Sequence, residues 1–228
     1  MSSTSLQQSE TKVSDRALAS WEIVSVVSST LIAEWLFVSV AGLSKLIVAI
    51  PIVLAVIVIF FSHRARNEGL REIGFRFDNF LKALRLLLAP MLMAVALGLG
   101  IGWRLGSINF MRWHPTRFLI IQLVLGFGWG LVQQYVLQGF LNRRAMTVLG
   151  KGWTSVFVIA AVFATLHLPN PLLTAITFAA GIIWSAVYQR VPNLFAVAIS
   201  HSIMTWLVVS TIPPSALNQL RVGIRYFF

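Results

Sequence analysis

Residues 118–141 read FLIIQLVLGFGWGLVQQYVLQGFL and contain no charged side chain. A transmembrane helix needs about 20 predominantly apolar residues, so this run is long enough to cross a bilayer. Gly126, Gly130, Gln134 and Gln138 recur at every fourth position and therefore share one helix face. Glycines let a neighbouring backbone approach closely, and glutamines offer amide donors and acceptors to it. The stretch therefore predicts a membrane helix with a polar, closely packed face.

The rest of the chain has the same character. Of its 228 residues 57% are hydrophobic and 11% are charged, whereas a soluble domain carries about 25% charged residues. Helices are expected at 21–43, 45–62, 83–103, 118–141, 153–168, 171–190 and 193–211. We therefore predict an all-α, polytopic membrane bundle of about seven transmembrane helices over 21–211. A disordered polar tail at 1–20 precedes it, and a short basic and aromatic tail at 212–228 follows.

Charge is distributed unevenly along the chain. The seven acidic residues all lie within the first 78 positions, and residues 79–228 carry eleven Lys or Arg with no Asp or Glu. The basic residues lie between apolar runs, which favours loops beside anionic lipid over a nucleic-acid partner. Their bias predicts a cytoplasmic N-terminus, and we expect an integral protein of a bacterial-type plasma membrane. The chain also has no cysteine, which excludes thiolate nucleophiles, disulfides and Cys-based metal sites.

Two histidines fall within predicted membrane helices. His167 follows Phe163 by one turn, just before Pro169, and His201 is followed one turn later by Thr205. A single membrane histidine is more often a packing residue than a ligand. Two histidines on separate helices, with a glutamine stripe on a third, predict a shared buried site. The other two, His63 and His114, fall in loops and are interpreted as interfacial residues.

These polar residues form three motifs in order along the chain: Gln133-Gln134-x-x-x-Gln138, Phe163-x-x-x-His167 and His201-x-x-x-Thr205. They resemble the Glu-Glu-x-x-x-Arg, Phe-x-x-x-His and His-x-x-x-Asn motifs of the CAAX protease and bacteriocin-processing family of intramembrane endopeptidases. The resemblance covers a core at about 118–210. It implies cleavage of a prenylated or transmembrane peptide in or near the lipid bilayer.

The resemblance also implies a role for each motif position. Gln133 and His167 occupy the positions that activate water, Gln134 and Gln138 those that support the site, and His201 and Thr205 those that hold the oxyanion. A glutamine amide cannot accept a proton from water at neutral pH, so the general base is missing. Zinc would have only His167 and His201 as ligands, whereas catalytic zinc sites use three protein ligands.

The three glutamines nevertheless form a consistent set of changes relative to the family motif. Both acids and the base of the family motif are glutamine here, so hydrogen-bonding capacity is kept and all charge is removed. Losing only one partner would leave an uncompensated buried charge. Glu34, in the middle of the first predicted helix, is a hypothetical replacement base. The competing interpretation is a protonated carboxyl group that bonds a neighbouring helix.

Three functions remain open at this stage. The first is an intramembrane endopeptidase that works through His167, His201 and Glu34 or by another mechanism. The second is a catalytically silent homologue that binds a lipidated or transmembrane peptide, with an immunity, chaperone or scaffold role. The third is a haem protein, because two histidines on neighbouring membrane helices can serve as axial ligands.

Overall fold

The computed structural model describes residues 3–37, 45–114 and 117–228, and every regular element within them is helical. The long helices are α1 (Ser3–Ile32), α2 (Lys45–Ala65), α4 (Phe80–Leu105), α5 (Arg117–Gln134), α7 (Trp153–Thr165), α8 (Pro171–Arg190) and α9 (Leu194–Thr211). The shorter ones are η1 (Ala33–Phe37), α3 (Leu70–Ile73), η2 (Phe110–Trp113), η3 (Tyr135–Asn142), α6 (Arg143–Leu149), α10 (Pro214–Leu217), η4 (Asn218–Leu220) and η5 (Gly223–Phe227).

The prediction of a polytopic helical protein is confirmed. Five described helices are long and apolar enough to cross a membrane: Val13–Trp35, Phe80–Leu105, Leu119–Leu149, Pro171–Arg190 and Leu194–Thr211. Two shorter apolar helices, Ala49–Ala65 and Trp153–Thr165, complete the set of seven expected runs. Large apolar side chains on the outer faces of α2, α4 and α5 are exposed, as a protein surrounded by acyl chains requires.

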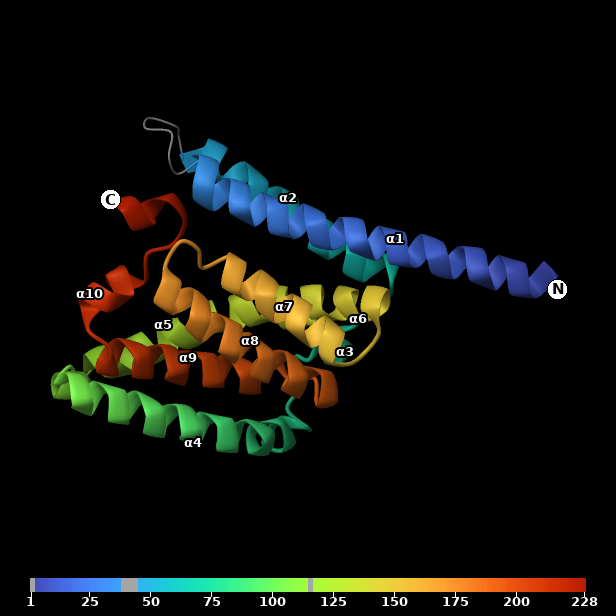
Figure 1. Ribbon diagram of the computed structural model, residues 1–228. Coiled ribbons are helices and arrows are strands. Elements are labelled where there is room, and N and C mark those ends of the chain that lie inside the picture. The colour runs from blue at the N-terminus through green and yellow to red at the C-terminus, as the bar shows by residue number, and fades with distance from the viewer. Residues whose placement is uncertain (1–2, 38–44, 115–116) are drawn as a thin grey trace.

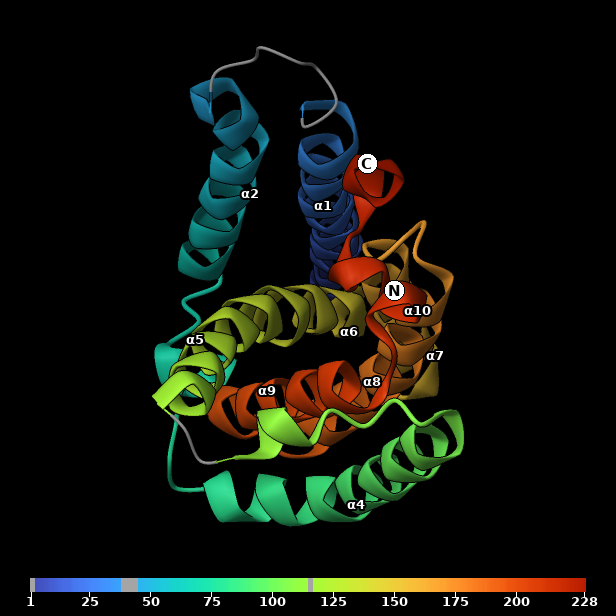
Figure 2. The same cartoon turned by 90° about the vertical axis from the view of Figure 1, so that its left-hand side faces the viewer.

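The helices form three groups. α1 and α2 pair on one side and α4 lies on the opposite side, with α5 to α9 between them (Figures 1 and 2). Within the central group α7 packs on α8, and α9 packs on both α5 and α4. α9 is therefore surrounded by the other helices, and half of its apolar window is buried, the highest share among the spans.

The first helix differs from the prediction. α1 begins at Ser3, so the segment 3–20, which its polar composition predicts to be a disordered tail, is helical. Extending an existing helix costs little, because nucleation is the expensive step. The added turns also carry Asp15, whose carboxylate pairs with Arg66 at 2.9 Å. Sequence composition could not reveal this partner, which lies 51 positions away.

A buried ion cluster joins α1, α2 and the loop after α2 to the start of α6. Arg144, 1% exposed, donates to both carboxylate oxygens of Glu68 at 3.0 and 2.7 Å. Arg143 also donates to Glu68, at 2.7 Å, and Glu22 lies 3.1 Å from the Arg144 guanidinium. The first third of the chain, which holds all the acidic residues, thus supplies the counter-charges for Arg143 and Arg144 of the part without Asp or Glu. The cluster fixes the end of the continuous helix that carries the three glutamines.

His63 belongs to the same cluster and is not an interfacial residue, contrary to the prediction from its loop position. It is 7% exposed, and its Nδ1 atom lies 2.6 Å from a Glu68 oxygen. Its ring also packs on Tyr135 and on the edge of Phe140. His63 is buried because α2 extends past residue 62 and turns its last residues toward η3.

Candidate functional site

The site begins with the close approach of α5 to α9. A Cβ atom on Gly126 would lie 3.0 Å from the Ser202 hydroxyl oxygen, and one on Gly130 would lie 3.3 Å from the Ala198 carbonyl oxygen. Larger residues at these two positions would push the helices apart. The glycines therefore act as the helical spacing predicts, and they bring the glutamine face of α5 against His201.

Gln134 and His201 meet at this contact. The amide nitrogen of Gln134 lies 3.1 Å from Nδ1 of His201, and Gln134 is fully buried. An amide nitrogen only donates, so Nδ1 accepts and the proton of the neutral imidazole resides on Nε2. The amide oxygen of Gln134 has no hydrogen-bond partner among the described residues. The pair is uncharged and leaves one acceptor and one donor for another group.

The Phe163 ring links the two imidazoles. It makes edge contacts with His167 at a centroid distance of 4.7 Å and with His201 at 6.1 Å. The other face of His201 is covered by Trp184 of α8, which stacks on it at 4.7 Å. His167 does not lie on α7, which ends at Thr165, but in the turn that precedes Pro169. Its Nδ1 atom donates to the Phe163 carbonyl oxygen at 2.7 Å, which leaves Nε2 as an acceptor.

Gln138 faces a different neighbour from Gln134. It is fully buried and donates to the Ser185 hydroxyl of α8 at 3.2 Å, and its oxygen accepts from Asn142 at 2.7 Å. Asn142 in turn accepts from Gln189 at 2.9 Å. This network of neutral side chains joins η3 to α8, where the family motif has an arginine. Gln138 is thus a bonded structural residue one turn after Gln134.

The remaining predicted site residues are less closely associated. Gln133 is half-buried and has no hydrogen-bond partner within the described residues. Thr205 is exposed one turn after His201. Glu34 lies in η1 against Gly223, and the Gly223 N–H donates to the Leu168 carbonyl oxygen at 2.7 Å. Glu34 is thus near the turn that carries His167, but it does not line the pocket described next.

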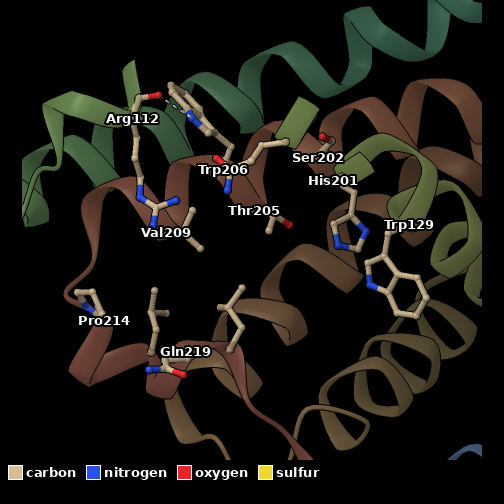
Figure 3. A pocket seen from close by; sticks show the side chains of 13 residues that line it. Arg112, Trp129, His201, Ser202, Thr205, Trp206, Val209, Pro214 and Gln219 are labelled. Carbon is tan, nitrogen blue, oxygen red and sulfur yellow. Dashed lines mark hydrogen bonds between the residues drawn. The ribbon is translucent and has the colours of Figure 1, made fainter. Parts of the chain in front are cut away.

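A pocket of about 400 Å³ opens beside His201. Its walls are formed by α5, α9, η2 and the segment after α9. Figure 3 shows His201 and Thr205 directed into it, with the Trp206 indole at its edge beside the Arg112 backbone. Its lining residues are Arg112, Gln122, Gly126, Trp129, His201, Ser202, Thr205, Trp206, Val209, Pro214, Leu217, Gln219 and Leu220. The volume falls in the usual range for small-molecule and cofactor sites.

A comparison with protein families finds a similarity over the part of the chain that holds this site. A family model described as type II CAAX prenyl endopeptidase Rce1-like matches residues 113–207. Residues 113–207, called the Rce1-like segment below, are therefore similar to this family over less than half of the chain. The match confirms the resemblance read from the three motifs, and the Rce1-like segment contains all of them. No curated protein and no solved structure matched the chain.

The donor set of the Rce1-like segment does not fit a zinc ion. Catalytic zinc takes three protein ligands, and no cluster of three His, Cys, Asp or Glu occurs within the part of the chain that the structure describes. In addition, the Gln134 amide donates to Nδ1 of His201 and so places the imidazole proton on Nε2, which leaves His201 without a free nitrogen lone pair for a metal. The metal role implied for these two histidines therefore lacks its third ligand and a compensating negative charge.

Sequence reasoning missed several residues of the site. Ser185, Trp184 and Arg112 contact or line it, yet each belongs to an apolar run or a basic loop with no motif around it. The sequence offered one signal for Trp184. Tryptophans of membrane proteins are enriched near the ends of the helices, whereas Trp184 lies well inside α8. Its indole N–H is satisfied by Ser200, the residue before His201, at 3.0 Å.

Proposed function

We propose that this membrane protein binds the peptide segment of a lipidated or transmembrane protein in the pocket beside His201, and does not hydrolyse it. The Rce1-like match supports a peptide ligand at the membrane. The pocket offers an imidazole N–H, hydroxyl groups and amides between aromatic walls, which suits a peptide backbone with apolar side chains.

One observation argues against hydrolysis. At the centre of the site, His201 is hydrogen-bonded to the neutral Gln134 amide. Hydrolysis requires a group that removes a proton from water, and the amide of Gln133, at the position that the resemblance assigns to water activation, does not. The His201 Nε2–H is instead suited to donate a hydrogen bond to a peptide carbonyl oxygen. Substitution of all three charged motif positions by glutamine keeps the site in shape and electrically neutral.

A second candidate function, hydrolysis with Glu34 as the base, is favoured by one contact. Glu34 packs on Gly223, which is bonded to the residue directly after His167. One carboxylate oxygen of Glu34 is buried without a partner in the described residues. This carboxylate is not part of the pocket lining. We therefore rank this function second.

A haem role is not supported by the arrangement of the rings. Two axial histidines must face each other across a flat slot wide enough for a porphyrin. Here the Phe163 ring contacts both imidazoles, and Trp184 stacks on His201. For topology, we propose a plasma-membrane protein with a cytoplasmic N-terminus, because that side collects the N-terminal basic residues, loop 63–82 and loop 142–152.

The test uses the full chain in lipid nanodiscs and a fluorescein-labelled peptide that ends in S-farnesyl-Cys-Val-Ile-Ala. Anisotropy measures binding, and chromatography of the same samples measures product. We expect binding without product, weakened roughly tenfold by His201→Ala through loss of a peptide hydrogen bond and of ring contacts. His114→Ala is the matched control, because His114 is exposed and does not line the pocket.

Three other outcomes would contradict the proposal. Product that disappears in His167→Ala would establish hydrolysis, and Glu34→Gln would then show whether Glu34 is the base. Equal binding by wild type and His201→Ala would remove the pocket as the binding site. Absence of binding would overturn the peptide-binding function itself.

A further inference from the structure

The pocket beside His201 contains one charged residue among those that the structure describes there. Arg112, at the end opposite His201 and Trp129, contributes a guanidinium group beside Val209 (Figure 3). The other polar lining groups are neutral amides, hydroxyls and the His201 imidazole. A single cation at one end of the pocket would orient a bound ligand, because it attracts an anionic group of the ligand to that end.

Arg112 is held in place by its own short helix. The Asn109 N–H donates to the Ser210 carbonyl oxygen at 2.8 Å, which fastens the start of η2 to the end of α9. The Trp206 indole N–H donates to the Arg112 carbonyl oxygen at 3.3 Å, and the Trp206 ring packs on Trp113 at 4.3 Å. The backbone of Arg112 is thus fixed from both sides, so only its side chain has to be ordered when a ligand binds.

Nothing in the described part of the chain neutralises this guanidinium. No ion pair or side-chain hydrogen bond of Arg112 occurs there, whereas Arg66, Arg143 and Arg144 all pair with carboxylates. The reason lies in the sequence, since residues 79–228 contain no Asp or Glu. Arg112 is half-buried in the pocket and has no carboxylate partner there. Its guanidinium group can therefore bind a carboxylate of a ligand, because the planar fork of N–H groups matches carboxylate geometry.

The composition of the pocket favours a peptide carboxylate over a lipid phosphate. Gln122, Ser202, Thr205 and Gln219 place donors and acceptors along the lining. A peptide backbone can bond to these groups, while an acyl chain leaves them unsatisfied. A second pocket of about 310 Å³ between α4, α8 and α9 is lined almost entirely by apolar side chains and is the better site for a hydrocarbon.

We infer that Arg112 determines specificity by pairing with the free α-carboxylate of the bound peptide. This inference rests on the proposed peptide-binding function. It fixes the polarity of the ligand: the C-terminus lies at η2, and the chain runs toward His201 and Gln134. Peptides whose C-terminus is blocked, or internal segments of a chain, are then poor ligands.

The experiment compares two probes that differ by one group. The farnesylated, fluorescein-labelled peptide is prepared with a free C-terminal carboxylate and as the C-terminal amide, and both are titrated against the full chain in nanodiscs. We expect the acid to bind roughly tenfold or more tightly than the amide, the usual value of a charge-assisted hydrogen bond. In Arg112→Gln the two probes bind alike, and in Arg112→Lys part of the preference remains.

Arg104→Gln is the matched control, because Arg104 is an exposed arginine in the last turn of α4 that does not line the pocket. It is expected to keep the wild-type preference. Thermal unfolding of Arg112→Gln, followed by tryptophan fluorescence, shows that the variant is folded. Both probes are also titrated in nanodiscs of phosphatidylcholine and of phosphatidylcholine with phosphatidylglycerol.

The outcomes separate this inference from the proposed function. Equal binding of acid and amide by wild type overturns the role of Arg112 and leaves peptide binding intact. An effect of Arg112→Gln that depends on the anionic lipid and not on the peptide terminus assigns the guanidinium to lipid phosphate, which also overturns it. Failure of both probes to bind overturns the inference together with the function beneath it.

Discussion

The amide nitrogen of Gln134 lies 3.1 Å from Nδ1 of His201, and both side chains are uncharged. The resemblance to intramembrane endopeptidases would place a carboxylate at this glutamine and an arginine one turn later at Gln138. Both positions carry amides with well-defined partners: His201 for Gln134, and Ser185 with Asn142 for Gln138. The site has therefore exchanged an ionic arrangement for a hydrogen-bonded one, and its polar contacts persist without charge.

The first prediction concerns restoration of the lost acid. We expect Gln133→Glu alone to show no hydrolysis of the farnesylated peptide, because the new carboxylate would be half-buried without an arginine at position 138 to balance it. The measurement is chromatographic detection of peptide fragments from protein in nanodiscs. Gln133→Ala serves as the control for folding and peptide binding. Robust cleavage by the single Gln133→Glu variant would show that charge balance does not limit the site.

The second prediction compares two glutamines of the same helix. Gln138→Ala leaves the Ser185 hydroxyl and an Asn142 donor without partners, and we expect it to lower the free energy of unfolding by about 1–2 kcal/mol. Gln133→Ala removes a half-buried side chain without a hydrogen-bond partner in the described residues and should change it by less than about 0.5 kcal/mol. Denaturation by SDS measures both, and equal effects would contradict the assignment of Gln138 as the bonded glutamine.

The sequence predicts the membrane spans well because hydrophobic length is a local property. The boundaries 171–190 for α8 and 193–211 for α9 agree with the structure to within one residue, since prolines and asparagines end or begin these helices. The three motifs at helical spacing predicted a shared site of Gln133, His167 and His201. In the structure Gln134, and not Gln133, bonds to His201, and the Phe163 ring contacts both imidazoles.

Long-range pairing could not be predicted in the same way. Glu68 and Arg144 are 76 positions apart, and each belongs to a stretch that reads as a polar loop. The same holds for Arg112, whose importance depends on which helices enclose it and on the absence of a carboxylate nearby. Periodicity reports the face of one helix, whereas these features depend on how separate helices are placed around one another.

The third prediction tests the packing that holds Phe163 near Trp184. A Cβ atom on Gly181 of α8 would lie 2.9 Å from the Ala160 Cα atom of α7, a backbone contact that cannot yield without moving a helix. We expect Gly181→Ala to cost about 1–3 kcal/mol of stability, measured by thermal or SDS unfolding. Gly128→Ala on α5 is the control, because nothing lies within 4 Å of its Cβ position. If Gly181→Ala leaves the stability unchanged, α7 and α8 are less closely packed than the structure shows.

The fourth prediction concerns Glu68 in the buried ion cluster. Burial alone would raise the pKa of this carboxyl group, but hydrogen bonds from His63, Arg144 and Arg143 outweigh burial and hold the pKa well below its usual range. Glu68→Gln removes the charge and leaves the buried Arg144 guanidinium without its main counter-ion. We expect the variant to lose about 3–5 kcal/mol of stability at neutral pH, as is usual when one partner of a buried pair is removed.

The same pKa shift predicts how stability depends on pH. A carboxyl group whose pKa is lower in the folded state contributes stability above its unfolded pKa of about 4.3, and that contribution is lost as the pH falls toward the folded pKa. Wild-type stability should therefore decline below about pH 4.3, and Glu68→Gln should show a shallower decline, in unfolding curves followed by tryptophan fluorescence. Arg71→Gln, which removes an exposed charge outside the cluster, should retain the wild-type profile. An unchanged pH profile in Glu68→Gln would mean that other carboxylates dominate acid unfolding and that the cluster contributes little to holding α6 against α1 and α2.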